Sequence, residues 1–131
     1  MAQMVKQTVV YESAELDVLL NPDNAFQIGV QVSNTGVSAD ANGKKIIKAG
    51  TPVGGTTNVL KTRNAVLQMT NTSSLGANSQ GVLRHDVDVT LGNANATLIV
   101  RGEVDSSKCP TIEATAETAL THIIFVNGGA Y

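Results

Sequence analysis

Apolar and polar residues alternate in two stretches of the chain, which is the pattern of β-strands with one buried face. In the first stretch, apolar residues occupy every second position: Phe26, Ile28, Val30 and Val32. A period of two places these side chains on one side of an extended backbone, so residues 26–32 are predicted to form a strand. Asn42-Gly43 is a strong signal for a hairpin turn, because both residues tolerate a positive φ angle. Residues 44–49 are expected to be the returning strand.

The second alternating stretch, residues 81–105, predicts a long central hairpin. Two strand-like runs, 82–90 and 97–104, flank a polar turn at residues 92–95. If Thr90 lies opposite Thr97, apolar residues pair on one face: Leu83 with Val104, Val87 with Val100 and Val89 with Leu98. The same register pairs opposite charges on the other face: Asp86 with Arg101 and Arg84 with Glu103. Such pairs each contribute roughly 0.2–1 kcal/mol, and a one-residue slip would place charges on the core face.

Two further segments complete the predicted fold. Residues 50–55 combine several glycines with Pro52 and are predicted to be a loop, since Pro cannot donate to a central strand. Pro110 or Thr111 suits the first turn of a helix. Apolar residues then recur at helical spacing: Ile112, Ala116, Ala119, Leu120 and Ile123. A short strand at residues 123–126 is expected to follow.

Residues 1–20 precede a clear break at Asn21-Pro22-Asp23-Asn24, where Pro fixes φ and Asn and Asp favour a turn. We therefore predict a separable N-terminal arm over residues 1–20 and a single domain over residues 21–131. The arm contains a strand-forming run whose alternate residues would fit a partner sheet if the run added to it as a strand: Gln7, Val9 and Tyr11. The alternative is a frayed terminus, which is common at chain ends.

These elements define the expected fold class. It is mainly β (α+β), a small β-sandwich or barrel-like domain with a central long hairpin, one late helix and an extended N-terminal arm. The chain has 131 residues, enough for one domain, and its hydrophobic fraction of 42% supports a core.

Composition then narrows the classes of function. Aromatic residues make up only 3% of the chain and Trp is absent, which disfavours a surface that stacks bases. The formal net charge of -2 disfavours a nucleic-acid partner. No apolar run approaches the ~20 residues that span a bilayer, and none at the start suits a signal peptide. Neither nucleic acid nor a membrane is expected as a partner.

Charge is unevenly distributed along the chain. Residues 1–43 contain one Lys and five acidic residues, whereas residues 44–63 contain five basic residues and no acid. An acidic end and a basic middle would support head-to-tail association between copies. The alternative is an ordinary solvated surface.

Candidate catalytic residues are few. His85-Asp86 invites a hydrolase hypothesis, and His122 is a second candidate base. Neighbouring residues of a strand point to opposite faces, so His85 and Asp86 are not expected to pair as base and orienting acid. The chain also lacks a nucleophile signature of the G-x-S-x-G kind. We therefore predict that it is not an enzyme.

Candidate metal ligands are equally sparse. Asp86 and Asp88 share a strand face close to Asn93 and Asn95, but their spacing does not match a calcium-binding EF-hand loop. A charged outer face is the favoured interpretation. Cys109 is the only cysteine, which excludes an intrachain disulfide and a cysteine-based metal site, and a packed thiol is expected. No cofactor and no metal are predicted.

Three segments follow one another in an order that resembles a known family. They are NGKKIIKAGTPVGG from Asn42, then QGVLRHDVDVTLGNANATLIVRGEVD, and finally KCPTIEATAETALTHIIFV. Together they resemble the extended entry segment, the long central hairpin and the Pro-initiated helix of the head decoration proteins of tailed bacteriophages, the small lambda-type cement proteins of the capsid. The resemblance covers roughly two-thirds of the chain, and no residue before about Asn42 matches.

The resemblance implies a structural role in the virion. Such proteins form trimers on the outside of the expanded head, bind the major capsid protein and brace the junctions between capsomers. Their N-terminal arm contacts capsid protein, a role that would fall on residues 1–20 here. The alternative from a different class is a β-rich binding module, such as a fibre or adhesin-like domain that recognises a surface ligand.

Overall fold

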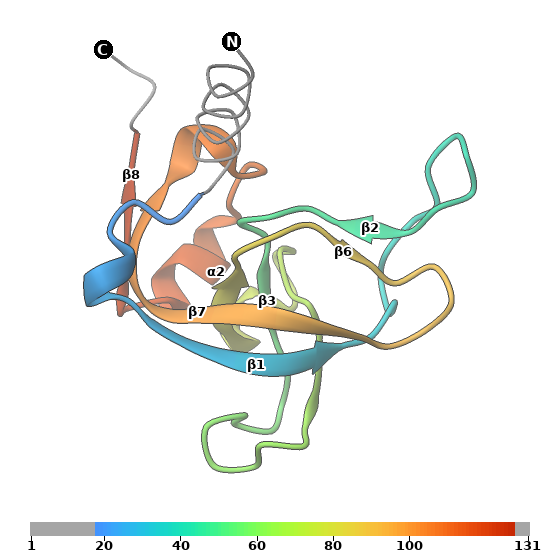
Figure 1. Cartoon of the computed structure of the whole chain (residues 1–131), viewed down its shortest axis with the longest axis horizontal. Coiled ribbons are helices and arrows are strands. Elements are labelled where there is room, and N and C mark those ends of the chain that lie inside the picture. Colours follow the sequence, from blue (N-terminus) through green and yellow to red (C-terminus); the bar gives the residue numbers. More distant parts are fainter. Residues whose placement is uncertain (1–17, 128–131) are drawn as a thin grey trace, which may run out of the picture.

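A computed structural model describes residues 18–127 and shows a small β-barrel with a short helix packed beside it (Figure 1). The strands of the main sheet pair in the order β1-β4-β3-β5-β7-β8. Strand β1 also pairs with β7, so the first five strands of that order close into a barrel and β8 extends it. A separate two-stranded sheet, β2-β6, lies at one side. The expected fold class, mainly β with one late helix, is confirmed for the described residues.

The elements are short apart from β7. The strands are β1 (Phe26–Val32), β2 (Ile46–Ile47), β3 (Pro52–Gly54), β4 (Val66–Met69), β5 (Ser79–Leu83), β6 (Val87–Asp88), β7 (Ala94–Asp105) and β8 (Ile123–Val126). The helices are α2 (Ala114–Ala119) and three 3-10 turns, η1 (Pro22–Asn24), η2 (Gly76–Asn78) and η3 (Ser106–Lys108).

Two apolar clusters lie on opposite faces of the barrel wall. The first draws on all five barrel strands and fills the interior: Val30, Val32, Ile47, Val53, Val59, Leu67, Leu83, Val87, Val89 and Leu98. The second lies on the other side of the wall, under α2 and β8: Val18, Leu19, Val82, Ile99, Val104, Leu120 and Ile123. Strands β5 and β7 are therefore buried on both faces at their centres, because successive side chains of a strand point to opposite sides.

The late helix is short and rich in Thr, so its own propensity is weak. Contacts with the loop before β5 hold it in place. The Asn71 side chain donates to the Thr111 carbonyl at 2.8 Å and accepts from the Glu113 N–H at 2.7 Å. Ala116 is fully buried, and the helix packs on Gly76 so closely that a Cβ there would lie 2.6 Å from the Ala116 nitrogen. The helix begins at Ala114, later than the predicted start near Pro110.

Several local predictions are confirmed. Strand β1 occupies residues 26–32, and β8 occupies residues 123–126. A turn forms at Asn42-Gly43, with Gly43 at φ +77°. The returning strand is reduced to Ile46–Ile47, however, and it pairs with β6 rather than with the strand that precedes the turn.

The predicted register of the central hairpin is wrong. Leu83 lies opposite Leu98 rather than Val104, a displacement of six positions along β7. After Arg84 the chain bends away from β7, and Val87–Asp88 pairs with Ile46–Ile47 instead. The reason is that strands distant in sequence compete for the same partners. Strand β1 pairs with β7, and β2 pairs with β6, and neither pairing is available in the hairpin alone. A displacement by an even number keeps each residue on its face, so Leu83 and Leu98 still point into the core.

The two predicted charge pairs are absent as a consequence. Arg101 lies opposite Phe26 of β1, and Glu103 lies beside Ile124 of β8. Asp86 accepts a hydrogen bond from the Ala49 N–H at 2.7 Å, and Arg84 donates to the Gln27 side-chain oxygen at 2.8 Å. These four charged groups therefore serve other contacts.

The prediction that residues 50–55 form a loop is also wrong. Residues 52–54 form β3, which lies between β4 and β5. Pro52 is tolerated because it is the first residue of the strand, where no N–H is required, while its carbonyl accepts from the Thr70 N–H at 3.0 Å. Gly54 is needed because a Cβ there would collide with the Asn78 carbonyl.

The boundary of the N-terminal arm at residue 20 requires correction. Val18 and Leu19 are buried in the second apolar cluster. The Asp105 N–H donates to the Val18 carbonyl at 2.8 Å, and the Leu20 N–H donates to the Glu103 carbonyl at 3.0 Å. Residues 18–20 therefore belong to the folded domain: their backbone pairs with β7, and the side chains of Val18 and Leu19 are buried.

Gly50 offers a direct test of how tightly the segment before β3 is packed. It has φ +85°, and an added Cβ would collide with the Cys109 sulfur and lie 2.8 Å from the Cys109 Cβ. We expect Gly50→Ala to lower the free energy of unfolding by about 2–4 kcal/mol, from left-handed backbone strain and overpacking together. Urea denaturation would measure this value.

Gly43→Ala is the matched control, because Gly43 has φ +77° and no atom within 4 Å of an added Cβ. It should cost only the backbone strain of about 1–2 kcal/mol. Equal losses in the two variants would contradict the packing of Cys109 on Gly50.

Candidate functional site

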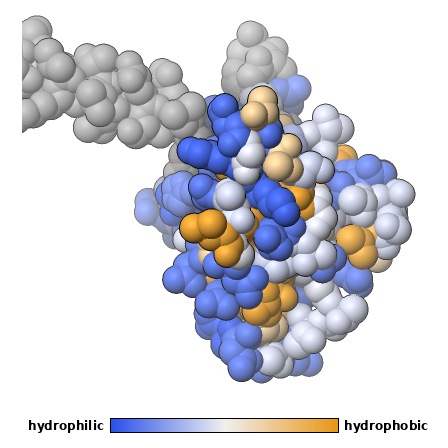
Figure 2. Space-filling view, turned by 90° about the vertical axis from the view of Figure 1, so that its right-hand side faces the viewer, coloured by the Kyte–Doolittle hydropathy of each residue, from blue (hydrophilic) through white to orange (hydrophobic). Residues whose placement is uncertain are grey.

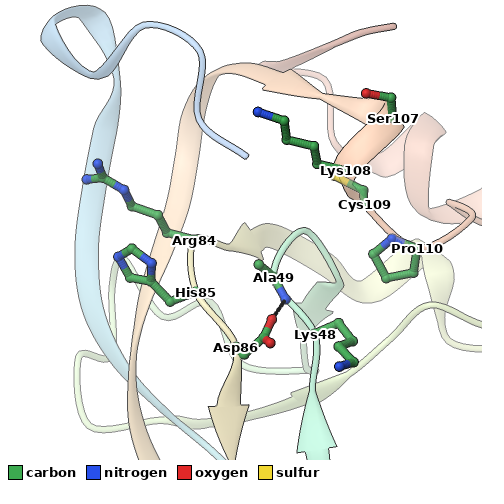
Figure 3. A pocket seen from close by; sticks show the side chains of 9 residues that line it. All are labelled: Lys48, Ala49, Arg84, His85, Asp86, Ser107, Lys108, Cys109 and Pro110. Carbon is green, nitrogen blue, oxygen red and sulfur yellow. Dashed lines mark hydrogen bonds between the residues drawn. The ribbon is translucent and has the colours of Figure 1, made fainter. Parts of the chain in front are cut away.

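A surface groove lies where three connecting segments meet (Figure 3). These are the segment between β2 and β3, the bend between β5 and β6, and the end of η3. The groove encloses about 660 Å³. Its lining residues are Lys48, Ala49, Arg84, His85, Asp86, Ser107, Lys108, Cys109 and Pro110. We call it the basic groove after Lys48, Arg84 and Lys108.

Hydrogen bonds fix the walls of the groove. Asp86 accepts from the Ala49 N–H, and the Gly50 N–H donates to the Leu83 carbonyl at 2.7 Å, which clamps the segment before β3 onto the bend after β5. On the opposite wall, the buried Asp105 side chain accepts from the Ser107 N–H at 3.0 Å and from its hydroxyl at 2.6 Å. These bonds orient η3 and with it Lys108.

The charge of the groove is predominantly positive. Lys48 and Lys108 are exposed, Arg84 is half-buried, and Asp86 is the one carboxylate among the lining residues. The Lys108 amine lies 4.0 Å from the buried Asp105 carboxylate, at the limit of ion-pair distance. The groove therefore has the electrostatic character of a site for anionic groups.

A hydrolytic arrangement is not assembled in the groove. The side chains of His85 and Asp86 point apart in the bend between β5 and β6 (Figure 3). The Ser107 hydroxyl donates to Asp105, not to a histidine. His122 lies beyond the end of α2 and does not line the groove.

The oxygen-rich stretch around Asp88 is occupied by local hydrogen bonds. The Asp88 carboxylate accepts from the Thr90 N–H at 2.9 Å and from the Thr90 hydroxyl at 2.5 Å. These bonds stabilise the charged form and lower the pKa of Asp88. Within residues 18–127, no group of three His, Cys, Asp or Glu residues is placed to hold a metal ion.

A second feature lies on the outer side of β7 and β8. Three large apolar residues surround the same stretch of β7: Leu20, Phe26 and Ile124, whose exposed fractions are 44%, 45% and 62%. Leu20 bonds to Glu103 of β7, Ile124 pairs beside the same residue, and Phe26 pairs with Arg101. In the described part of the chain β8 pairs only with β7, which leaves its outer edge open. We call these three residues the β8-edge patch.

The face on the β2-β6 side of the molecule differs in character. It is largely hydrophilic, and its apolar areas are small and separated (Figure 2). An exposed apolar patch beside an open strand edge, rather than scattered apolar residues, is what marks an interaction surface.

The residues proposed from sequence are thus distributed differently from expectation. Gln7, Val9 and Tyr11 lie outside the described residues. Arg84 and Asp86 come together in the basic groove, whereas Arg101 and Glu103 lie by the β8-edge patch. Sequence reasoning missed Lys48 and Lys108 as site residues, although the excess of basic residues over 44–63 was a signal for Lys48.

Cys109 is packed, as expected. Its thiol donates to the Asp105 carbonyl at 3.3 Å, and burial, followed by the negative charge of Asp105, raises the pKa of Cys109 to about 11. We expect alkylation by iodoacetamide at pH 8 to be much slower in the folded protein than in urea, because the thiolate is the reactive species. Mass spectrometry of timed samples would measure both rates.

The same pKa shift fixes the sign of a pH effect. Between about pH 9 and pH 11 the unfolded chain loses the thiol proton and the folded protein keeps it, so stability should fall as pH rises through this window. Cys109→Ser should remove this pH dependence of stability.

For the alkylation experiment, equal rates in the folded and unfolded protein would contradict the packed thiol.

Comparison with known proteins adds no relative. No protein-family model matches the chain, and no curated protein matches it either. Among the described residues, no helix is both long enough and apolar enough to cross a membrane.

Proposed function

We propose that this chain is a non-enzymatic capsid decoration protein that binds the outside of an expanded bacteriophage head and stabilises the junctions between capsomers. The observation that carries the proposal is the ordered resemblance of the three segments from Asn42 onward. In the fold these segments supply β2 and β3, then β5 to β7, then α2 and β8. All three are parts of the described domain, and β4 and η2 lie between the first and the second.

The position of the chain ends supports a tethering role. The backbone of Asp105 bonds to Val18, and Asp105 pairs with Val126 of β8. The first and last described residues therefore leave the barrel at the same end (Figure 1). An arm that starts here would bind the major capsid protein while the barrel stays outside the shell, in the virion.

The energetics of such binding require no catalytic group. A protein that binds the assembled shell but not the free subunits adds its binding free energy to shell stability. At a free concentration of 100 Kd this linkage contributes ~2.7 kcal/mol per site. A trimer that engages several subunits gains further through effective concentration.

The β8-edge patch supports contacts between copies. Leu20, Phe26 and Ile124 are apolar and partly exposed; Ile124 lies on β8, whose outer edge is open, and Leu20 and Phe26 lie across β7 from it. A second copy would cover the patch and pair with that edge, which removes apolar surface from water. We assign the subunit contacts of the proposed trimer to this surface.

The arm is tested by truncation. Deleting residues 1–17 leaves every described contact in place, so we expect the melting temperature to change little while co-sedimentation with expanded shells is lost. Immature shells serve as the control for specific binding. Undiminished co-sedimentation of the truncated protein with mature shells would overturn the assignment.

Point variants separate side-chain fit from mere chain length. In a strand, Gln7, Val9 and Tyr11 share one face, and Thr8 and Val10 share the other. Replacing the first set with Ala should weaken shell binding by roughly tenfold or more, while Ala at Thr8 and Val10 should have a smaller effect.

A longer truncation, of residues 1–20, should unfold the domain, since it removes the buried residues Val18 and Leu19.

The subunit contact is tested by Ile124→Asp. A charge on this patch should raise the dissociation constant of self-association at least ~tenfold, because an unpaired charge would be buried. Leu91→Asp is the matched control, since Leu91 is fully exposed and lies outside the patch. Sedimentation velocity over a concentration series would measure both. Unchanged association in Ile124→Asp would refute the assignment of the patch.

A further inference from the structure

We propose that the basic groove holds the acidic segment of residues 12–17 of the same chain. The inference concerns the free protein and does not depend on the proposed function, since no shell takes part in it. It assigns an occupant to the groove and gives the arm a fixed starting point.

The place where the described chain begins supports this assignment. The Val18 carbonyl accepts from the Asp105 N–H, and Asp105 lies within ion-pair distance of Lys108. The described chain therefore begins beside one wall of the groove. In Figure 3 the blue trace of the described N-terminal end runs on the side of the groove where Lys108 lies. Residues 12–17 extend over at most ~20 Å, enough to follow the groove.

The charges of the two parts are complementary. Residues 12–17 read ESAELD and contain three carboxylates, Glu12, Glu15 and Asp17, with no base. The groove presents Lys48, Arg84 and Lys108 against two carboxylates: Asp86, which accepts from the Ala49 N–H, and the buried Asp105, 4.0 Å from Lys108. Arg84 has a planar guanidinium that suits a carboxylate. The excess of three acids therefore meets an excess of bases.

The segment of the same chain has an advantage over a second copy. Because Val18 is fixed beside the groove, residues 12–17 are present there at an effective concentration in the millimolar range. A second copy would have to reach this concentration in solution. We therefore commit to the intramolecular contact.

The proposed contact rests on several ion pairs at the surface of the domain. Exposed ion pairs are individually weak, worth about 0–1 kcal/mol each. The segment is thus positioned by several weak contacts and can exchange its partners.

Zero-length crosslinking of the full-length protein tests the proposal. A carbodiimide joins a carboxylate to a lysine amine only when the two are in contact. We expect crosslinks from residues 12–17 to Lys48 and Lys108, with a yield roughly tenfold above that to Lys61. Lys61 is the control, because it is exposed in the loop between β3 and β4, which lies at the opposite end of the molecule (Figure 1).

Two further measurements make the outcome specific. An equal mixture of unlabelled and isotope-labelled protein distinguishes crosslinks within a chain from those between chains, and we expect only peptides of matched label. In 1 M salt the Debye length falls to about 3 Å, so the yield at Lys48 and Lys108 should fall toward that at Lys61.

A charge variant that cannot itself be crosslinked completes the design. Arg84→Gln should lower the yield at Lys48 and Lys108 severalfold, and Arg63→Gln should leave it unchanged. A melting curve of each variant checks that the domain is folded. Yields that are equal at Lys61 and in the groove would overturn the proposal. Mixed-label crosslinks would overturn it in favour of a second copy.

Discussion

The barrel depends on the burial of β7 on both faces at once. Leu98 points into the barrel and Ile99 into the cluster under α2, and both are fully buried. Full burial of one large aliphatic side chain contributes roughly 1.5–3 kcal/mol. Strands β1 and β5 hold the two edges of β7 at this point, so its backbone groups are also paired. A chain without Trp obtains its core in this way, from aliphatic side chains on both sides of one wall.

Asp105, at the end of β7, connects this wall to the surface features. Its N–H binds Val18, its carbonyl accepts from the Cys109 thiol, and its buried carboxylate orients η3. Asp105 therefore contacts Val18 and Cys109 and also orients the turn that carries Lys108 into the basic groove. This side of the groove is therefore anchored to a buried residue at the end of β7.

Local patterns predicted the elements better than their partners. The period of two in β1 and the apolar run of β8 are properties of the segments themselves, and both strands were predicted at their observed bounds. The register of β7 was not, because a displacement by six positions leaves Leu83 and Leu98 on the same face and the apolar pattern cannot distinguish the two pairings. Pro52 was misjudged for a related reason, since its tolerance depends on being the first residue of a strand whose neighbours are distant in sequence.

The candidate site was harder to predict than the fold. Lys48, Arg84 and Lys108 are separated by 36 and 24 positions, and only the closing of the barrel brings their loops together. The predicted charge pairs Asp86 with Arg101 and Arg84 with Glu103 followed from a local pattern, but they do not form because β7 pairs with β1 and β6 pairs with β2. Charge imbalance along the sequence indicated an acidic and a basic segment, without indicating where the basic side chains lie in the fold.

The two proposed contact surfaces differ in physical character, and this difference bears on assembly. The basic groove acts through exposed charges, which salt screens and which exchange partners readily. The β8-edge patch acts through apolar area and backbone pairing, which salt weakens little. Under the proposed function, contacts between copies can therefore persist while the arm leaves its groove for the shell. An arm held by a buried apolar contact would have to break that contact first, and its transfer to a lattice would be slower and weaker.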